Sequence, residues 1–381
     1  MVVTDNEVCA SISEYMSDLV RSRGYPLEIH EVTTEDKYIV SIYRLPYGLV
    51  RIENEKPRQP VLLVHGLCSS AADALNVESQ MGYFLADRGF DVWLANCRGT
   101  TFSRGHQEFD HVQQSDSYWN FSFHEIGYYD IAAFIDEVLS VTGFKKIFYI
   151  GISQGATAYA VLMSTRPEYN QRILLSCLLC PGIKFQNASL FPVKFCFKYL
   201  VPLVQVFTLD LYQEAPLMDW IRYFGRKYAK PNSIAEYFYI KLWDILSWPF
   251  KSRSVDYRKI SITSPNTASN KQIKHFSQIL RANKFAQFDV GPEENIKKYG
   301  CKSPPLYDLS KLTAPVGIFY SENDMFYGTE DIDWIADQLN NCVLKYLVQY
   351  EKFNHMNFIY NKEITSLLYE PILKLMNEYL S

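Results

Sequence analysis

The feature that most constrains this chain is a Gly-x-Ser-x-Gly pentapeptide, residues 151–155, between an apolar run and a helical stretch. Residues 146–150 read as a buried strand, and residues 154–164 have helical spacing. A chain of this length would contain the pattern by chance about 0.1 times. So tight a turn needs glycines beside the serine, and it raises the hydroxyl above the sheet at the helix N-terminus. The pattern predicts that Ser153 is a nucleophile; an unreactive glycine-rich turn is the alternative.

Strands and helices alternate on both sides of this motif. Strands are predicted at residues 60–64, 90–95, 146–150, 174–179, 316–320 and 343–348. Helices are predicted at residues 81–88, 126–141, 154–164, 331–339 and 364–379. A strand hairpin at 27–32 and 38–44 precedes them. This alternation predicts an α/β fold with a mostly parallel, doubly wound sheet.

The alternation stops between residues 184 and 305, in a stretch rich in aromatic residues. Its segment 190–211 has thirteen strongly apolar residues, which would contribute about −4 to −8 kcal/mol to membrane insertion. Lys194 and Lys198 together would cost about 5 to 7 kcal/mol, before the prolines and Asp210 are added. The balance predicts amphipathic helices that cover a pocket or touch a lipid surface. We therefore predict a core of residues 1–183 and 306–381 with an inserted helical cap at 184–305.

The predicted nucleophile needs a base, because a serine hydroxyl attacks poorly until its proton is removed. In a fold of this kind the acid and then the histidine follow the nucleophile along the chain. Only His275 and His355 follow Ser153, and His275 falls inside the predicted cap. His355, between the last strand and the last helix, is the predicted base; a loop histidine bonded to a backbone carbonyl is the alternative.

The acid that orients the base should follow the preceding strand. The turn Ser-Glu-Asn-Asp follows the strand at 316–320, and its Asp324 is the predicted acid. Glu322 in the same turn is the first alternative. Asp331 and Asp333 are also candidates, although both are better placed to cap the next helix.

The oxyanion that forms on attack needs preorganised N–H donors. This fold takes one from the residue after the nucleophile, which is Gln154, and one from the loop after an earlier strand. The turn His65-Gly66-Leu67 occupies that loop, so the backbone N–H of Leu67 is the second predicted donor. His65 itself is expected to brace the turn.

Further motifs occur in order along nearly the whole chain. They are Gly24-Tyr25-Pro26, Thr34-Glu35-Asp36, Arg44-Leu45-Pro46-Tyr47-Gly48, His65-Gly66-Leu67, Asp91-Val92-Trp93-Leu94, Arg98-Gly99, Tyr129-Asp130, Asn323-Asp324 and Asn354-His355. With these motifs the chain resembles the acid lipase family, which includes gastric and lysosomal acid lipases and steryl ester hydrolases. The resemblance implies the α/β-hydrolase fold, an apolar acyl tunnel under a helical cap, and a cofactor-free mechanism on triacylglycerols or steryl esters. It implies the triad Ser153, Asp324 and His355.

The chain departs from the family pattern at positions beside the triad. Ile152 stands where the family usually has histidine, and Asn357 where it often has aspartate. The cap lacks the closely spaced cysteines of secreted relatives. These departures leave the three predicted catalytic residues unchanged and bear on pH optimum and location.

Composition excludes several other classes. A formal net charge of −4 provides no basic field for nucleic acid. No phosphate-binding loop or zinc-ligand spacing occurs in the sequence, so no cofactor or metal is expected. The eight cysteines are expected to be buried free thiols. Acidic residues interrupt the first twenty positions, which predicts no secretory signal and an intracellular or lipid-surface location, although family relatives are often lysosomal or secreted.

The sequence thus predicts a hydrolase of lipid esters that works through an acyl-enzyme. A lipid acyltransferase on the same triad and a non-catalytic lipid-binding protein are the alternatives. The expected partner is a lipid ester, with peripheral contact to a membrane or lipid droplet through the cap.

Overall fold

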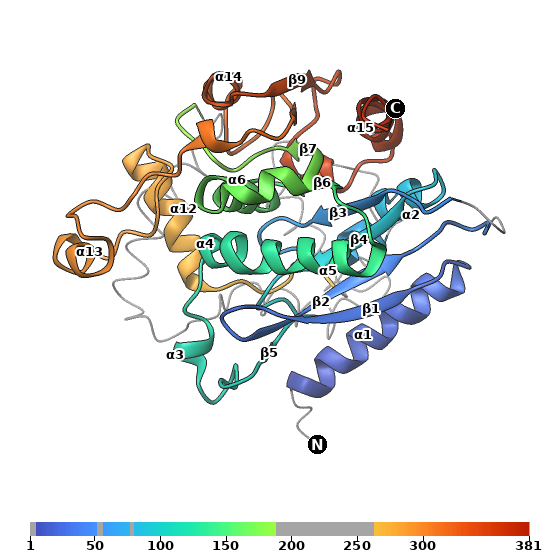
Figure 1. Cartoon of the computed structure of the whole chain (residues 1–381), viewed down its shortest axis with the longest axis horizontal. Coiled ribbons are helices and arrows are strands. Elements are labelled where there is room, and N and C mark those ends of the chain that lie inside the picture. Colours follow the sequence, from blue (N-terminus) through green and yellow to red (C-terminus); the bar gives the residue numbers. More distant parts are fainter. Residues whose placement is uncertain (1–4, 52–55, 77–79, 188–262, 381) are drawn as a thin grey trace, which may run out of the picture.

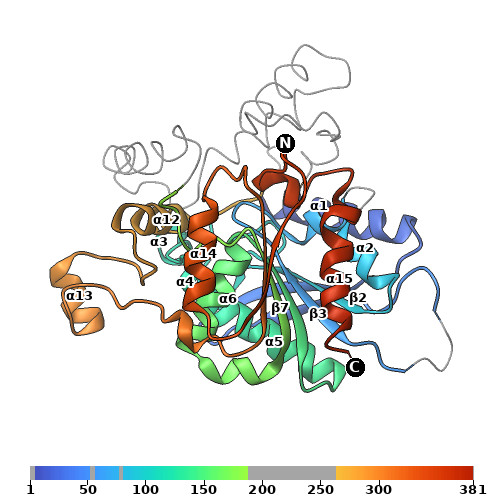
Figure 2. The same cartoon turned by 90° about the horizontal axis from the view of Figure 1, so that it is seen from above.

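Helices lie on both sides of a central sheet in the computed structural model, which describes residues 5–51, 56–76, 80–187 and 263–380. Figure 2 shows α2 (Met81–Ala86) and α15 (Glu370–Asn377) to one side of the strands. On the other side are α6 (Gln154–Thr165) and α14 (Thr329–Gln338). The apolar faces of both layers are buried against the sheet, which is the arrangement expected of an α/β protein.

The sheet runs through the molecule in the order β1-β2-β4-β3-β6-β7-β8-β9, with β5 paired to β2 (Figure 1). Its strands are β1 (Glu28–Thr33), β2 (Tyr38–Leu45), β3 (Pro60–Val64), β4 (Asp91–Asn96), β5 (Gly105–His106), β6 (Ile147–Ile152), β7 (Ile173–Leu179), β8 (Val316–Tyr320) and β9 (Cys342–Leu347). β2 pairs antiparallel with β1, β4 and β5. The pairs β3–β4, β3–β6, β6–β7, β7–β8 and β8–β9 are parallel. The predicted hairpin and the mostly parallel sheet are confirmed.

The burial of each strand follows its place in the sheet. β3, β4 and β6 lie in the interior of the sheet and are buried along their whole length. Helices cover both faces of such strands, which explains why their sequences are continuous apolar runs. β1 and β9 are the edge strands, and exposed residues alternate with half-buried ones along most of their length.

The remaining helices surround the sheet or precede it. They are α1 (Asp5–Ser22), α3 (Ser115–Tyr118), α4 (Phe123–Glu125), α5 (Ala132–Thr142), α12 (Asn270–Ala282) and α13 (Pro292–Tyr299). Short 3-10 turns are η1 (Ala71–Ala74), η3 (Pro167–Arg172), η5 (Leu309–Lys311) and η6 (His355–Phe358), and π turns are η2 (Ile126–Ile131) and η7 (Thr365–Tyr369).

Each predicted strand and helix of the core is present within a few residues of its predicted ends, and several features were not predicted, among them the following. The helix α1 packs Met16 and Val20, both fully buried, against the core. Their four-residue spacing, shared with Ile12, is the sequence signal for that helix. The helices predicted at 126–141 and 364–379 both begin with a π turn. The short β5 extends the hairpin side of the sheet.

The segment predicted to be a cap is described only in part. Residues 188–262, which include the apolar segment 190–211, lie outside the described residues. Residues 263–269 and α12 follow, and α12 places Phe276, Ile279 and Leu280 in the hydrophobic core. In Figure 1, α13 lies at the edge of the molecule beyond α12. The limits 184–305 for the cap stay a prediction.

The expectation of buried cysteines is only partly correct. No disulfide joins the seven cysteines in the described part of the chain, and Cys97, Cys177 and Cys180 are buried. Cys301, however, is exposed. It lies in the polar loop after α13, where no apolar layer covers it.

A buried ionic network joins the hairpin, the end of β4 and η2. The side chain of Arg98 is fully buried; its guanidinium donates to Asp130 at 2.7 Å and to both carboxylate oxygens of Asp36 at 2.5 and 2.8 Å. The ring of Tyr38 lies 3.9 Å from the guanidinium carbon. Burial raises the pKa of Asp130 to about 6, although the charge of Arg98 opposes this shift.

Replacing Asp130 with alanine is expected to lower the free energy of unfolding by about 3–5 kcal/mol, because a buried cation loses a partner. Urea denaturation followed by circular dichroism measures the change. Asp333→Ala is the matched control, because it breaks the exposed Asp333–Lys345 pair and should change stability little. Equal losses of unfolding free energy in the two variants would contradict the prediction that the buried network stabilises the fold more than the surface pair does.

Candidate active site

Ser153 occupies the turn between β6 and α6, at the carboxyl ends of the parallel strands. Its φ of 50° and ψ of −109° are unusual for a residue with a side chain. Hydrogen bonds hold this strained backbone on both sides. Ser153 N–H donates to Leu179 O at 2.9 Å, and Ser153 O accepts from the N–H groups of Ala156 and Thr157 at 3.0 and 3.1 Å. Such over-determined strain is typical of functional turns.

The two glycines of the motif allow the turn to pack closely. A Cβ atom on Gly155 would lie 2.3 Å from Val64 O, and one on Gly151 would lie 2.7 Å from Ala156 N. Backbone atoms cannot yield to such contacts. Glycine at these positions is therefore required by the close packing of α6 against β3 and β6.

The three residues predicted to form the triad lie in one hydrogen-bonded row. His355 Nδ1 is 2.7 Å from Asp324 Oδ2, and His355 Nε2 is 3.0 Å from Ser153 Oγ. Because a carboxylate only accepts hydrogen bonds, Nδ1 carries the proton and Nε2 is free to accept from the serine hydroxyl. Ser153 and His355 are 202 positions apart along the chain, so tertiary structure alone brings them together.

Electrostatics of the row favour a positive charge on the imidazole. Burial alone would lower the pKa of His355, but the Asp324 carboxylate and the neighbouring Cys180 together outweigh burial and raise that pKa well above its usual value. Burial also raises the pKa of the neighbouring Cys180 thiol, which keeps the thiol uncharged near neutral pH. The arrangement can therefore accept a proton from Ser153 and stabilise the imidazolium that results.

Local hydrogen bonds fix the two loops that carry the predicted base and the predicted acid. Asp324 Oδ1 accepts the N–H of Phe326 at 2.8 Å. Asn354 and Asn357 cap η6 reciprocally, since each side-chain oxygen accepts the backbone N–H of the other residue, at 2.9 and 3.1 Å. The Asn357 Nδ2 group also donates to Tyr360 O at 3.2 Å. An amide supplies both an acceptor and a donor here, whereas a carboxylate at position 357 would only accept.

The two predicted oxyanion donors belong to segments that flank Ser153. Gln154 is the first residue of α6, so its N–H has no acceptor within the helix. Gly66 lies against Ser153, since a Cβ there would be 3.4 Å from Ser153 Cβ. Leu67 follows directly in the same turn. The role of both N–H groups stays a prediction.

His65 braces this turn, as predicted. The N–H of Cys97 donates to His65 Nε2 at 3.1 Å, which leaves Nδ1–H to donate to Gly66 O at 2.8 Å. Burial lowers the pKa of His65 to about 4, so the ring is neutral and joins the end of β3 to the end of β4.

The alternative catalytic residues have other partners. Both ring nitrogens of His275 are hydrogen-bonded, one to a serine hydroxyl at 3.0 Å and one to a backbone carbonyl at 2.9 Å. Glu322 is exposed. Asp331 accepts the backbone N–H of Gly328 at the start of α14, and Asp333 forms its surface pair. None of the four lies in the Ser153 row.

Asp73 is a buried residue near the site that sequence reasoning missed. Its carboxyl group accepts hydrogen bonds from Ser69, Ser264 and Tyr360, which belong to the loop after β3, the segment before α12 and the loop after η6. Burial raises its pKa. An acid within the small-residue run 69–74 was the available signal. This carboxyl group joins three loops near the Ser153 row.

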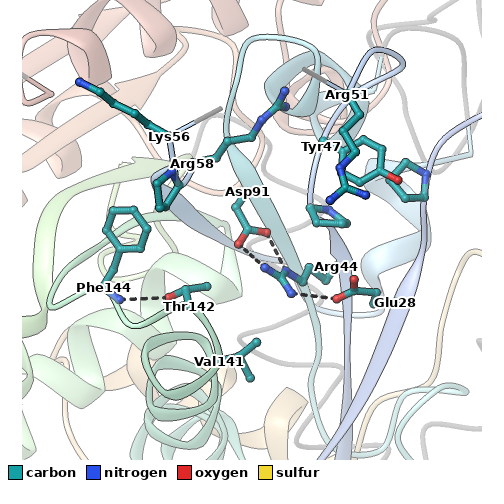
Figure 3. A pocket seen from close by; sticks show the side chains of 13 residues that line it. Glu28, Arg44, Tyr47, Arg51, Lys56, Arg58, Asp91, Val141, Thr142 and Phe144 are labelled. Atoms are coloured by element: carbon teal, nitrogen blue, oxygen red, sulfur yellow. Dashed lines mark hydrogen bonds and ion pairs between the residues drawn. The ribbon is translucent and has the colours of Figure 1, made fainter. Parts of the chain in front are cut away.

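A pocket of about 950 Å³ lies at the amino ends of the parallel strands, opposite to the end that carries Ser153 (Figure 3). Asp91, the first residue of β4, lies on its wall and accepts two hydrogen bonds of 2.9 Å from Arg44. Arg44 also donates to Glu28 at 2.9 Å. Since Ser153 follows the carboxyl end of β6, this pocket at the amino ends of the strands is separate from the Ser153 row. Its charged lining does not suit an acyl chain.

Neither a membrane-spanning helix nor a cluster of metal ligands was found within the described residues. There, no helix combines the length and the apolar character that crossing a bilayer requires. In the same residues, no three His, Cys, Asp or Glu side chains are grouped so that they could hold a metal ion.

Two family models match the sequence. A model described as alpha/beta hydrolase fold matches residues 59–362. A second, described as partial alpha/beta-hydrolase lipase region, matches residues 16–75. Together they cover the hairpin, the sheet and the three residues of the Ser153 row.

Curated relatives are similar over most of their length. The chain is 35% identical to Lipase 3 of Drosophila melanogaster, covering 94% of this chain and 92% of that protein. It is 31% identical to Lipase member N of Mus musculus, over 98% and 93% of the two chains. It is 29% identical to the gastric triacylglycerol lipase of Bos taurus, over 95% and 91%.

Solved structures share the fold at low identity. An acetylester hydrolase from Corynebacterium glutamicum superposes with a TM-score of 0.56 at 12% identity, covering 95% of this chain and 98% of that one. An esterase from Exiguobacterium antarcticum gives a TM-score of 0.51 at 13% identity, over 92% and 99%. Together with the family model, these similarities confirm the predicted fold.

Proposed function

The chain belongs to the acid lipase family of α/β-hydrolases and is a carboxylic ester hydrolase of the lipase type, and we propose that Ser153, His355 and Asp324 carry its reaction. The observation that supports this proposal is the continuous row of hydrogen bonds, 3.0 and 2.7 Å long, from the serine hydroxyl to the buried carboxylate. A nucleophile, a base and an orienting acid in that order can perform acyl transfer.

Acylation begins when Ser153 Oγ attacks the ester carbonyl carbon and its proton moves to His355 Nε2. The carbonyl oxygen becomes an oxyanion, which accepts hydrogen bonds from the N–H groups of Leu67 and Gln154. Collapse of this intermediate breaks the bond between carbonyl carbon and alkoxy oxygen. His355 Nε2–H then protonates the leaving alcohol, while Asp324 holds the ring in place.

Deacylation repeats these steps with water as the nucleophile. Water attacks the acyl carbonyl and gives a proton to His355. Collapse releases the carboxylic acid, and the proton returns to Ser153 Oγ. The triad ends the cycle unchanged, and each proton that leaves one group is taken up by another.

The proposed substrates are triacylglycerols or steryl esters. Support comes from the gastric triacylglycerol lipase among the relatives and from the aromatic content of the predicted cap, residues 184–305. Aromatic and aliphatic side chains over the nucleophile would bind long acyl chains. The same cap would contact a membrane or a lipid droplet peripherally.

Labelling with a fluorophosphonate probe tests the proposed nucleophile. The purified protein is expected to react covalently, and peptide mass mapping should locate the label on Ser153. Hydrolysis of a triacylglycerol and a cholesteryl ester should exceed that of a short soluble ester at equal concentration. Assays from acid to mildly alkaline pH would give the optimum.

Each alternative predicts a different result in these assays. Transfer of the acyl group to an added alcohol in place of water would indicate an acyltransferase. Folded protein that binds lipid but never labels would indicate a non-catalytic lipid-binding protein and would overturn the proposal.

A further inference from the structure

The side chain of Gln154 has a buried partner that the proposed mechanism does not use. In that mechanism only its backbone N–H acts. Its side-chain Oε1 accepts a hydrogen bond from Gln272 Nε2 at 2.9 Å, and each of the two residues is only 3% exposed. They are 118 positions apart, one at the start of α6 and one in the first turn of α12. We propose that Gln272 is a positioning residue for the oxyanion donor Gln154, an inference that rests on the proposed function.

The orientation of the Gln272 amide is set by its own helix. Ser269 and Gln272 form a capping box, in which Gln272 N–H donates to Ser269 Oγ at 3.1 Å and Ser269 N–H donates to Gln272 Oε1 at 2.8 Å. Because Oε1 is committed to Ser269, the Nε2 group must point to Gln154. The Gln154 side-chain oxygen faces α12, so in this contact Gln272 is always the donor and Gln154 the acceptor.

The start of α12 is itself anchored to the core. Ser269 Oγ donates to Phe121 O, and the Asn266 N–H donates to Cys68 O at 2.6 Å. Cys68 directly follows Leu67, the other predicted oxyanion residue. Asn266 Oδ1 also accepts from the Thr101 N–H at 2.8 Å. Residues 266–272 therefore contact the segments of both predicted oxyanion donors, and they do so through buried polar groups.

Rigid placement of Gln154 matters because an N–H donor accelerates the reaction only when it already points to the position of the oxyanion. Gln154 follows Ser153, whose backbone is strained. A hydrogen bond at the far end of its side chain limits the rotation of the residue about that strained turn. Loss of the donor would leave a buried oxygen unsatisfied, and the residue would shift to find another partner.

Gln272→Glu and Gln272→Leu separate positioning from folding. The glutamate variant keeps the capping box, because its carboxylate can still accept from Ser269 N–H. When ionised it offers no donor to Gln154 and places negative charge near the oxyanion. When protonated it regains a donor. The leucine variant fills the space and has neither group at any pH.

We expect Gln272→Leu to lower kcat about 10- to 100-fold with KM nearly unchanged, as a small misplacement of catalytic groups does. The kcat of Gln272→Glu should be lowered by as much at neutral pH. It should recover toward the wild-type value as the pH is lowered through the pKa of the introduced carboxyl. Lys271 and His275 belong to α12, Glu125 pairs with Lys271, and His355 contacts Ser153. These titratable groups are also present in wild type, so each variant is compared with wild type at the same pH. Fluorophosphonate labelling rates should follow kcat.

Gln278→Glu is the matched control on the same helix. Gln278 forms two hydrogen bonds with the backbone of Asp289, at 2.7 and 2.9 Å, and lies in the second half of α12. This variant should keep wild-type kcat at every pH. Melting temperatures of all variants report folding separately from rate.

Wild-type protein that neither labels nor hydrolyses esters would reject the proposed function itself. Active wild type, with both Gln272 variants folded and within twofold of its kcat, would reject only the positioning role. A glutamate variant whose loss is the same at every pH would also overturn it, since protonation would then restore no donor.

Discussion

Replacing Ser153 with alanine is expected to lower kcat for a lipid ester by about 10⁶-fold and to abolish fluorophosphonate labelling. The alanine variant has no atom that can form the acyl-enzyme, although the oxyanion donors and the substrate site remain. About 10³- to 10⁴-fold acceleration over the uncatalysed reaction should therefore persist. Initial rates under saturating substrate measure the loss.

Ser164→Ala is the control for this substitution. Ser164 is a buried serine of α6, the helix that directly follows Ser153, and its hydroxyl donates to Ala160 O at 2.6 Å. It should keep normal labelling and wild-type rates. If Ser153→Ala kept a tenth of the wild-type labelling, the nucleophile would have to be another residue.

Replacing Asp324 with asparagine is expected to lower kcat by about 10⁴-fold. The asparagine amide can donate a hydrogen bond to His355 Nδ1. Nδ1 then acts as an acceptor, so the proton of the neutral ring lies on Nε2. With Nε2 protonated, no base remains to accept the Ser153 proton. KM should change much less than kcat, because the acid is fully buried behind the imidazole and touches no substrate.

The residual activity of Asp324→Asn should also have a shifted pH profile. The base acts only when neutral, so the acid limb of kcat/KM lies at the pKa of His355. In wild type the Asp324 carboxylate raises that pKa against the lowering effect of burial. Without the carboxylate the pKa of His355 loses its largest raising contribution while burial still lowers it, so the acid limb should move to lower pH.

Asp91→Asn is the matched control, because Asp91 is equally a buried, hydrogen-bonded carboxylate but lies at the opposite edge of the sheet. It should keep the wild-type profile. An acid limb that stays in place in Asp324→Asn would mean that Asp324 does not govern the base.

Much of the core could be predicted because its signals are local. A buried parallel strand is a continuous apolar run, as in β3 and β6, and a helix repeats its apolar residues every three or four positions. The order of elements then limited the base to His355 and favoured Asp324. Helix α1 had the same kind of signal at Met16 and Val20.

Predictions failed where packing decides more than local pattern. The two π turns have the same apolar spacing as the helices they begin, so periodicity does not distinguish them. Cys301 was expected to be buried like the cysteines within apolar strands, but its loop is exposed. The sequence around Asp73 does not distinguish it from an ordinary polar residue, because two of its three hydroxyl partners, Ser264 and Tyr360, are distant along the chain.

By itself, the sequence determined the order of strands and helices and predicted which residues act as nucleophile, acid and base. Those properties depend on side-chain chemistry and on neighbours a few positions away. Tertiary structure alone decided which buried polar groups meet, such as Gln154 with Gln272 or Asp73 with Tyr360. Burial removes water from these groups and makes a partner necessary, but only the packing of distant segments decides which partner each group finds.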